Sequence, residues 1–294
     1  MKLKKAIILA GGKASRLNPI TSAISKHLLP IYDKPMIYYP ISTLMLAGIR
    51  EFLIITNPEH LNVYKKILHD GSQWGINITY KIQKKPNGIP EALIIGKDFI
   101  GNDPICLNLG DHILFGKGLK KILIRNIENF EKNTIFAIKT NNPSDYGVIN
   151  FSNVGTPISI VEKPKKLTSN QIVCGLYLYD NKILSHTKKL KVSRRNEYEV
   201  SELNQNLINN NDLNVEILNK NIYWYDAGDP SRLLEVSNLV KKLVKKKIYV
   251  GYLENIAFIN GLISKKKYKD QILKYKKTEY GKNLGSIKKS DENY

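Results

Sequence analysis

The stretch KAIILAGG, residues Lys5–Gly12, combines a short apolar run with two glycines at its end. Apolar runs of this length are typical of strands that are buried on both faces of a parallel sheet. Similar runs recur along the first half of the chain, at Glu51–Thr56, Ile76–Gln83, Pro104–Leu109 and Thr134–Lys139. The first half is therefore predicted to contain a set of buried parallel strands.

Helical patterns separate these runs, and Asn, Pro and Gly mark several of their ends. The predicted helices cover Met36–Ala47, 57–69, Pro90–Lys97 and Gly118–Lys132. Alternation of strand and helix predicts parallel βαβ units with helices on both faces of the sheet. We therefore expect an α/β fold with a doubly wound, mostly parallel sheet in a Rossmann-like arrangement of three layers.

The pattern changes after Asn141–Pro143, where close-set strands replace the alternation. The elements predicted beyond this point are strands at Gly147–Phe151, Ile158–Glu162 and Val173–Tyr179, a helix at Tyr198–Ile208, strands at Leu213–Leu218 and Ile222–Tyr225, and helices at Pro230–Lys247 and Ser264–Lys276. The tail from Lys282 is expected to be loose. Because no Pro, Gly or Ser linker divides the halves, we expect one α/β domain over 1–240, with sides 1–140 and 141–240, and a C-terminal helical segment and tail over 241–294.

Composition excludes several classes of protein. Of the 294 residues, 42% are hydrophobic and 24% are charged, which is average for a globular chain. No segment approaches the ~18 apolar residues of a membrane span. The N-terminal apolar run is too short for a secretory signal, so a cytoplasmic protein is expected. Cys106 and Cys174 lie in apolar stretches without metal-binding spacing and are predicted to be buried free thiols.

The net charge of +20 is compatible with nucleic acid, an anionic membrane face or phosphorylated substrates. Much of the excess lies in lysine runs within 241–247 and 265–267, which lack interleaved arginine or aromatic residues. A solvated lysine-rich face therefore explains the charge better than a nucleic-acid surface.

Ligands of doubly wound sheets bind beyond the carboxyl ends of the strands, which directs attention to the loop after Lys5–Ala10. Gly11 and Gly12 allow close backbone approach, and Lys13 and Arg16 add positive charge. The loop matches neither the dinucleotide pattern nor the P-loop pattern. It is a candidate phosphate site, with a structural tight turn as the alternative.

Polar residues at other predicted strand and helix ends add candidates. Asp111 follows the strand Pro104–Leu109, and a carboxylate there suits Mg²⁺, although a turn or capping role is equally compatible. Lys26 stands alone before an apolar segment. His27 and His112 have no second histidine at metal spacing, so neither is predicted to bind zinc. No nucleophile elbow is present, which disfavours a covalent hydrolase.

Taken together, a series of ordered segments resembles the bacterial sugar-1-phosphate nucleotidyltransferases, in particular the thymidylyltransferases that act on glucose 1-phosphate. The resemblance covers residues 4 to about 285. The matching segments are Lys5–Gly12, Ser25–Lys26, Leu28–Pro40, Leu44–Arg50, Asp70–Asn77, Leu109–Asp111, Asp145–Val148, Glu162–Pro164, Gly175–Tyr177, and Trp224 with Asp226 and Gly228.

This resemblance implies a Mg²⁺-dependent reaction in the cytoplasm. An oxygen of glucose 1-phosphate attacks the α-phosphorus of dTTP, releases pyrophosphate and gives dTDP-glucose for dTDP-rhamnose-type biosynthesis. The attacking phosphate already carries about −1.5 to −2 charge, so no general base is needed. The resemblance also implies a homotetramer built as a dimer of dimers, without a nucleic-acid or membrane partner.

The resemblance assigns roles residue by residue. It implies a nucleotide side at 1–140 and an inserted sugar-binding lobe at 141–240. Arg16 and Lys26 are the implied catalytic residues, and Asp111 and Asp226 the implied metal ligands. The implied nucleotide-binding residues are Gly11, Gly12, Ala14, Ser15, Arg16, His27, Gln83, Gly88 and Asp111. The implied sugar-phosphate residues are Tyr146, Gly147, Glu162, Lys163 and Val173. The Gln83 amide offers a donor and an acceptor to the edge shared by thymine and uracil.

Three residues depart from the family pattern within the implied nucleotide shell. Ala14 stands in place of glycine, His27 in place of glutamine and His112 in place of asparagine. The alternatives that stay open are an enzyme that uses UTP or another sugar 1-phosphate, and a catalytically weak regulatory homologue. A metal-dependent glycosyltransferase is less favoured, because the expected pair of aspartates is replaced by Asp111, His112 and Ile113.

Overall fold

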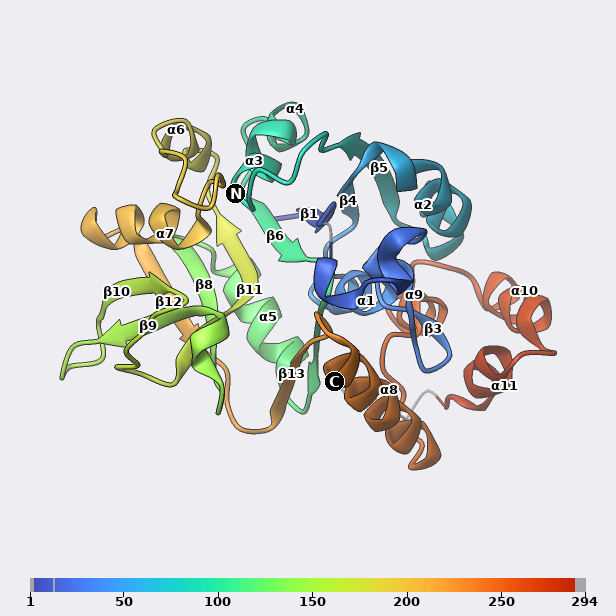
Figure 1. The fold of residues 1–294 in the computed structure, drawn as a ribbon. Coiled ribbons are helices and arrows are strands. Elements are labelled where there is room, and N and C mark those ends of the chain that lie inside the picture. Colours follow the sequence, from blue (N-terminus) through green and yellow to red (C-terminus); the bar gives the residue numbers. More distant parts are fainter. Residues whose placement is uncertain (1–2, 13, 289–294) are drawn as a thin grey trace.

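A computed structural model describes residues 3–12 and 14–288, and these residues form a central nine-stranded sheet (Figure 1). The strands run in the order β10-β9-β11-β6-β1-β4-β5, and β8 and β12 continue from β11. The strands of this sheet are β1 (Lys5–Ala10), β4 (Glu51–Thr56), β5 (Asn77–Ile82), β6 (Ile105–Leu109), β8 (Asn133–Lys139), β9 (Gly147–Phe151), β10 (Pro157–Glu162), β11 (Gln171–Tyr179) and β12 (Leu213–Ile217). Two short ribbons pair β7 (His112–Gly116) with β13 (Ile222–Asp226) and β2 (Pro30–Ile31) with β3 (Lys34–Pro35).

Eleven α-helices are present among the described residues. They are α1 (Tyr38–Leu46), α2 (Leu61–Leu68), α3 (Glu91–Ile95), α4 (Lys97–Ile100), α5 (Leu119–Glu128), α6 (Ile183–Thr187), α7 (Val200–Asn209), α8 (Pro230–Lys245), α9 (Leu253–Ile259), α10 (Lys265–Tyr275) and α11 (Glu279–Ser286). Figure 1 shows β9, β10 and α7 at one end of the molecule, with α10 and α11 at the other.

The strand β1 lies at the centre because both of its faces are apolar. It pairs in parallel with β4 on one edge and with β6 on the other. Ile7 and Ile8 are fully buried, and they belong to the separate cores on the two faces of the sheet. The predicted doubly wound α/β fold is therefore confirmed, and the antiparallel β11 joins its parallel part to the remaining strands.

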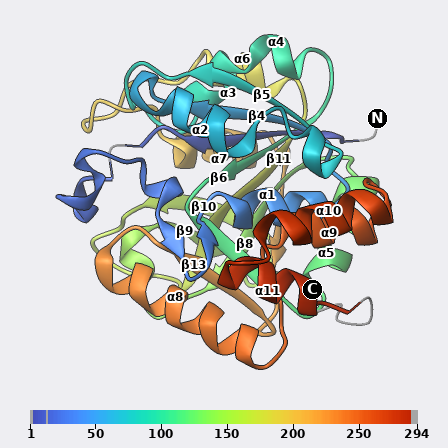
Figure 2. The same ribbon diagram turned by 90° about the vertical axis from the view of Figure 1, so that its right-hand side faces the viewer.

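Helices cover both faces of the sheet. Ile8 shares a core with α1, α5 and α9, whereas Ile7 shares one with α3, α6 and α7. In Figure 2, α3, α4 and α6 lie on one side of the sheet and α8, α9 and α11 on the other. The parallel pairing of β1 with β6 brings the loops that follow these two strands to the same edge of the sheet, where the Gly110 N–H donates to the Leu9 carbonyl oxygen at 3.0 Å.

Most predicted elements are present within a few residues of their expected bounds, but several were missed. The sequence analysis placed no element at β2, β3, β7, α6, α9 or α11, and the single helix predicted at Pro90–Lys97 is two helices, α3 and α4. The expectation of a loose tail from Lys282 was wrong for the residues up to Ser286, because α11 includes them. The side chain of Thr278 caps this helix by accepting from the Gly281 N–H, and Tyr280 anchors it in the core.

Hydrogen bonds to the buried carboxylate of Glu254 link the C-terminal helices to the rest of the domain. Glu254 of α9 accepts hydrogen bonds from Trp74 Nε1, at 3.1 Å, and from the Tyr280 hydroxyl. Burial raises the pKa of Glu254, and these two donors oppose the rise. Within the described part of the chain, no helix has the length and apolar character needed to cross a membrane.

Replacing Tyr280 by Phe is expected to lower the free energy of unfolding by about 1–3 kcal/mol, because Glu254 loses a donor in a buried site. Urea denaturation followed by circular dichroism measures the change. The matched control is Tyr223→Phe, since the Tyr223 side chain is 51% exposed and its change should stay within about 0.5 kcal/mol. Equal effects in the two variants would contradict this role of Tyr280.

Candidate functional site

A cavity of about 240 Å³ lies where β6, β9, β10, β11 and β13 converge. Its lining includes Arg16, Leu109, Asp111, His112, Asp145, Tyr146, Gly147, Glu162, Lys163, Val173, Gly175, Tyr177, Arg195, Glu199, Ser201, Asn204 and Asp226. Charged side chains of both signs therefore gather around one hollow at the carboxyl ends of the central strands, where ligands of doubly wound sheets bind.

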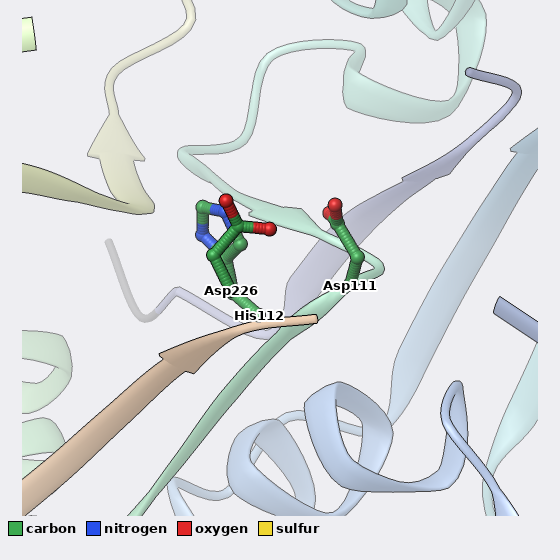
Figure 3. A group of neighbouring side chains, drawn as sticks. All are labelled: Asp111, His112 and Asp226. Carbon is green, nitrogen blue, oxygen red and sulfur yellow. The ribbon is translucent and has the colours of Figure 1, made fainter. Parts of the chain in front are cut away.

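Strand pairing brings two distant aspartates together. β7 and β13 pair in antiparallel fashion, and this register sets Asp226 directly opposite His112, the residue after Asp111. Figure 3 shows the three side chains grouped at the ends of their strands. Each offers one ligand atom, these atoms all lie within 4.8 Å of one another, and all three residues are buried. Two carboxylates and an imidazole in this arrangement fit a divalent cation.

Asp111 is paired with Lys26, which begins the 3₁₀ turn Lys26–Leu28. Burial is the largest single influence and disfavours ionisation of Asp111, but the charges of Lys26, His112 and His27, together with the hydrogen bond from Lys26, outweigh it and hold the pKa of this carboxyl well below its usual range. Asp111 is therefore a carboxylate at neutral pH, and its Oδ2 is the atom that Lys26 engages.

Asp226 is held by residues from other elements. Its Oδ2 accepts from the Tyr146 hydroxyl and from Arg232 Nη1, both at 3.2 Å. Arg16 Nη2 lies 3.9 Å from the same oxygen. Arg232 also reaches Asp145 at 2.5 Å, which fixes the guanidinium beneath the site. Among the described residues, Asp226 Oδ1 has no hydrogen-bonding partner, so it remains available to a ligand.

The loop after β1 carries an unusual backbone conformation. Ala14 has φ 49° and ψ 41°, a left-handed conformation that favours glycine. A 3₁₀ turn follows at Ser15–Leu17 and contains Arg16. A second cavity, of about 260 Å³, is bordered by Gly12, Ser15, Asn18, Thr21, Ile24, Ser25, Lys26, Asn57, Glu59 and His60. Lys26 thus borders this second cavity, and its partner Asp111 borders the first. Lys13, which was predicted to add charge here, is outside the described residues.

Gln83 follows β5 and is 4% exposed. Its Nε2 donates to Glu91 Oε2 at 2.7 Å and, more weakly, to the Gly88 carbonyl at 3.4 Å. Because a carboxylate accepts, Glu91 fixes the amide so that Oε1 faces Gly11. Gly88 has φ 106°, and a Cβ there would lie 2.1 Å from the Tyr198 carbonyl oxygen, so this position accommodates only glycine.

His27 is placed apart from both cavities. Its ring is buried beneath Gly110, and Nδ1 shares a 3.0 Å hydrogen bond with Ser25 Oγ. Burial, with help from the Lys26 charge, lowers the pKa of His27 to about 3. The ring is therefore neutral and supports the Lys26 turn from below, and the structure gives it no direct route to a ligand in either cavity.

The residues implied for the sugar phosphate line the first cavity together. Gly147, Glu162, Lys163 and Val173 come from β9, β10 and β11, and Tyr146 lies beside them. Burial raises the pKa of Glu162, although the Arg195 guanidinium opposes the rise. Glu162 Oε1 lies 3.5 Å from Arg195 Nη2.

Sequence reasoning missed several residues of this cavity, among them Arg195, Tyr177 and Asn204. Arg195 lies in an irregular segment before α7, where no motif marks it. Tyr177 and Asn204 are almost fully buried and are indistinguishable from core residues in the sequence. The adjacent basic residues Arg194 and Arg195 are the one signal in the sequence that could have directed attention to this segment.

Comparison with known proteins agrees with this geometry. The family model described as nucleotidyl transferase matches residues 5–242. A glucose-1-phosphate thymidylyltransferase from Neisseria meningitidis is 43% identical over 95% of this chain and 98% of its own length. The corresponding protein from Mycolicibacterium smegmatis is 42% identical over 94% and 96%.

Solved structures give the same result. A Bacillus anthracis protein described as a glucose-1-phosphate thymidylyltransferase, in complex with sucrose, superposes with a TM-score of 0.75 at 36% identity, covering 81% of this chain and 95% of its own. A UDP-glucose pyrophosphorylase in complex with UDP-glucose shares the fold, with a TM-score of 0.72 at 24% identity, over 82% of this chain and 99% of its own.

The fold and these relatives thus define an enzyme of the nucleotidyltransferase class. The chain belongs to the nucleotidyl transferase family.

The conformation of Ala14 leads to a prediction for the nucleotide loop. A left-handed alanine costs roughly 1–2 kcal/mol relative to glycine, so Ala14→Gly is expected to raise kcat/KM for the nucleoside triphosphate by about 5- to 30-fold. Steady-state kinetics at saturating second substrate measure it. Ala23→Gly is the matched control, because Ala23 is exposed and has φ −119°, where glycine offers no relief. No gain in Ala14→Gly over this control would show that the loop is adapted to alanine.

Proposed function

We propose that this protein transfers a thymidylyl group from dTTP to glucose 1-phosphate, giving dTDP-glucose and pyrophosphate. The observation that carries the proposal is the position of Lys26 and Asp111, which join the cavity beside the loop after β1 to the cavity beside Glu162. Such a pair suits a reaction between two phosphorylated substrates, because the Lys26 cation can bind phosphate and the Asp111 carboxylate can hold a metal ion. The names of the relatives supply the choice of nucleotide and sugar.

In the proposed reaction the protein positions phosphates and balances their charge. Lys26, 15% exposed at its side chain, is placed to bind the α-phosphate or the departing pyrophosphate. Arg16 and the amides around Gly11 and Gly12 bind the remaining phosphates. A divalent cation, taken as Mg²⁺, would be held by Asp111 and Asp226 and would supply charge neutralisation at the reacting phosphate.

On the acceptor side, the proposal places the hexose against Glu162 and its phosphate near Lys163 and Arg195. The half-buried Glu162 carboxylate at the cavity wall can accept from sugar hydroxyls, and Gly147 leaves space beside it, since a Cβ there would lie 3.4 Å from Glu162 Oε2. The two basic side chains, Lys163 and Arg195, border the same cavity. Lys163 and Arg195 thus supply positive charge on the acceptor side of a cavity whose wall also carries carboxylates.

Use of UTP is an alternative outcome within the same site. The function in dTDP-rhamnose-type biosynthesis and the homotetramer stay predictions from the resemblance.

A matrix of nucleoside triphosphates against sugar 1-phosphates tests the proposal through release of pyrophosphate. With Mg²⁺ present, dTTP and glucose 1-phosphate are expected to give the highest kcat/KM, and ATP and GTP the lowest. Asp111→Asn and Asp226→Asn should each lower turnover by roughly 10²-fold or more, the scale of losing one preorganised stabilising group. Equal rates with purine triphosphates, or normal turnover in either folded variant, would contradict the proposal.

The raised pKa of Glu162 predicts how sugar binding depends on pH. The ionised form accepts from hydroxyls, so KM for glucose 1-phosphate should rise as pH falls through a pKa above that of an ordinary glutamate. Measurement of KM across pH checks this. In Glu162→Gln the KM is expected to be higher and this part of the pH dependence to disappear, while titration of the substrate phosphate persists. Glu128→Gln, on α5 away from the site, is the control, and an unchanged profile in Glu162→Gln would refute the role.

A further inference from the structure

His112 is the residue of the site whose role the proposed chemistry does not explain. It stands where the family pattern has asparagine, it is 7% exposed, and its ring lies beside the Asp226 carboxylate (Figure 3). One atom of its ring lies within 4.8 Å of a carboxylate oxygen of both Asp111 and Asp226. Its chemistry therefore bears on any cation bound between these two residues.

The hydrogen bonds of His112 fix which ring nitrogen is available. Nδ1 lies 2.7 Å from the Cys174 carbonyl oxygen, and a carbonyl oxygen only accepts, so Nδ1 carries the proton. Trp224 Nε1 donates to the same oxygen at 3.0 Å. In the neutral ring Nε2 then carries the lone pair. A histidine that binds a metal through one nitrogen characteristically donates its other N–H to a carbonyl or carboxylate in this way.

The backbone around His112 is shaped to hold this orientation. Gly175 has φ 77°, and a Cβ at that position would lie 2.1 Å from His112 Nδ1. The Trp224 ring packs against the imidazole edge to face, with ring centroids 5.2 Å apart. The ring is thus confined between a glycine and an indole, with little freedom to turn away from the two carboxylates.

The three side chains share one organisation. Asp111 Oδ2 engages Lys26, Asp226 Oδ2 engages Arg232 and Tyr146, and His112 Nδ1 engages Cys174. Within 3–12 and 14–288, the second ligating atom of each group has no hydrogen-bonding partner. Each of the three oriented side chains therefore keeps one atom with which it can coordinate a cation.

We propose that His112 Nε2 is a third protein ligand of the divalent cation, so that the site favours cations that accept nitrogen donors over Mg²⁺. Carboxylates suit Mg²⁺, whereas imidazole strengthens binding of first-row transition cations such as Co²⁺. This inference rests on the proposed metal site and is independent of which nucleotide or sugar the enzyme uses.

Pulsed electron paramagnetic resonance of the full chain with Mn²⁺ alone tests the ligation directly. The protein is expected to show nitrogen hyperfine coupling from a directly bound imidazole, which changes in a predictable way when histidine is labelled with ¹⁵N. The coupling should vanish in His112→Asn, the family residue, and persist in His69→Asn, an exposed histidine outside the site. Circular dichroism confirms that each variant is folded.

Calorimetric titration with Co²⁺ and with Mg²⁺ supplies a second readout. The ratio of the Mg²⁺ to the Co²⁺ dissociation constant should fall by at least about tenfold in His112→Asn, since loss of coordination support typically costs 10- to 100-fold in affinity. Absence of nitrogen coupling in the metal-bound protein, absence of stoichiometric Mn²⁺ binding, or an unchanged ratio would each overturn the inference. None of these results depends on thymidylyl transfer. A failure of the proposed function would instead appear in the assay of pyrophosphate release.

Discussion

The pairing of β7 with β13 is the constraint on which the site depends. β7 follows β6 directly, with only Gly110 and Asp111 between them. β13, which comes much later in the sequence, pairs with β7. This register sets Asp226 opposite His112, so a shift of one residue would turn Asp226 to the other face of the ribbon. The pairing also joins the two parts of the chain, because β7 lies before residue 140 and β13 lies after it, directly ahead of α8 and the arginine that holds Asp226.

Charge balance explains how two carboxylates persist side by side in a buried site. Asp111 lies against Lys26, and Asp226 lies against Arg232, which also pairs with Asp145, so each carboxylate of the site has a cationic partner. Removing one partner from such a pair leaves an uncompensated charge, which is far more costly than the pair itself. A triphosphate would offer Lys26 and Arg16 a stronger anionic partner and leave Asp111 to a cation. Phosphate and metal therefore suit this site as a combination, because the cation offsets part of the negative charge that a triphosphate brings.

The sequence predicted the central sheet well because strands such as β1 and β4 are buried on both faces and consist of uninterrupted apolar runs. It did not predict β7, since His112–Gly116 continues the apolar run of β6 with only a two-residue turn between them. The nearness of Asp226 to Asp111 was implied only by the family resemblance, because it results from a long-range pairing that leaves no local pattern. The orientation of His112 depends on the Cys174 carbonyl and on the space above Gly175, and neither feature can be predicted from the sequence.

The contact between Glu91 and Gln83 has a consequence for the choice of pyrimidine. Since Glu91 and the Gly88 carbonyl accept from the Gln83 amide nitrogen, Gln83 presents only an oxygen towards the space beside Gly11. In the proposed reaction, thymine and uracil, which carry a hydrogen on N3, would donate to that oxygen, whereas cytosine carries a lone pair there and would be repelled. The Glu91 carboxylate would in this way restrict an amide that can both donate and accept to the acceptor role.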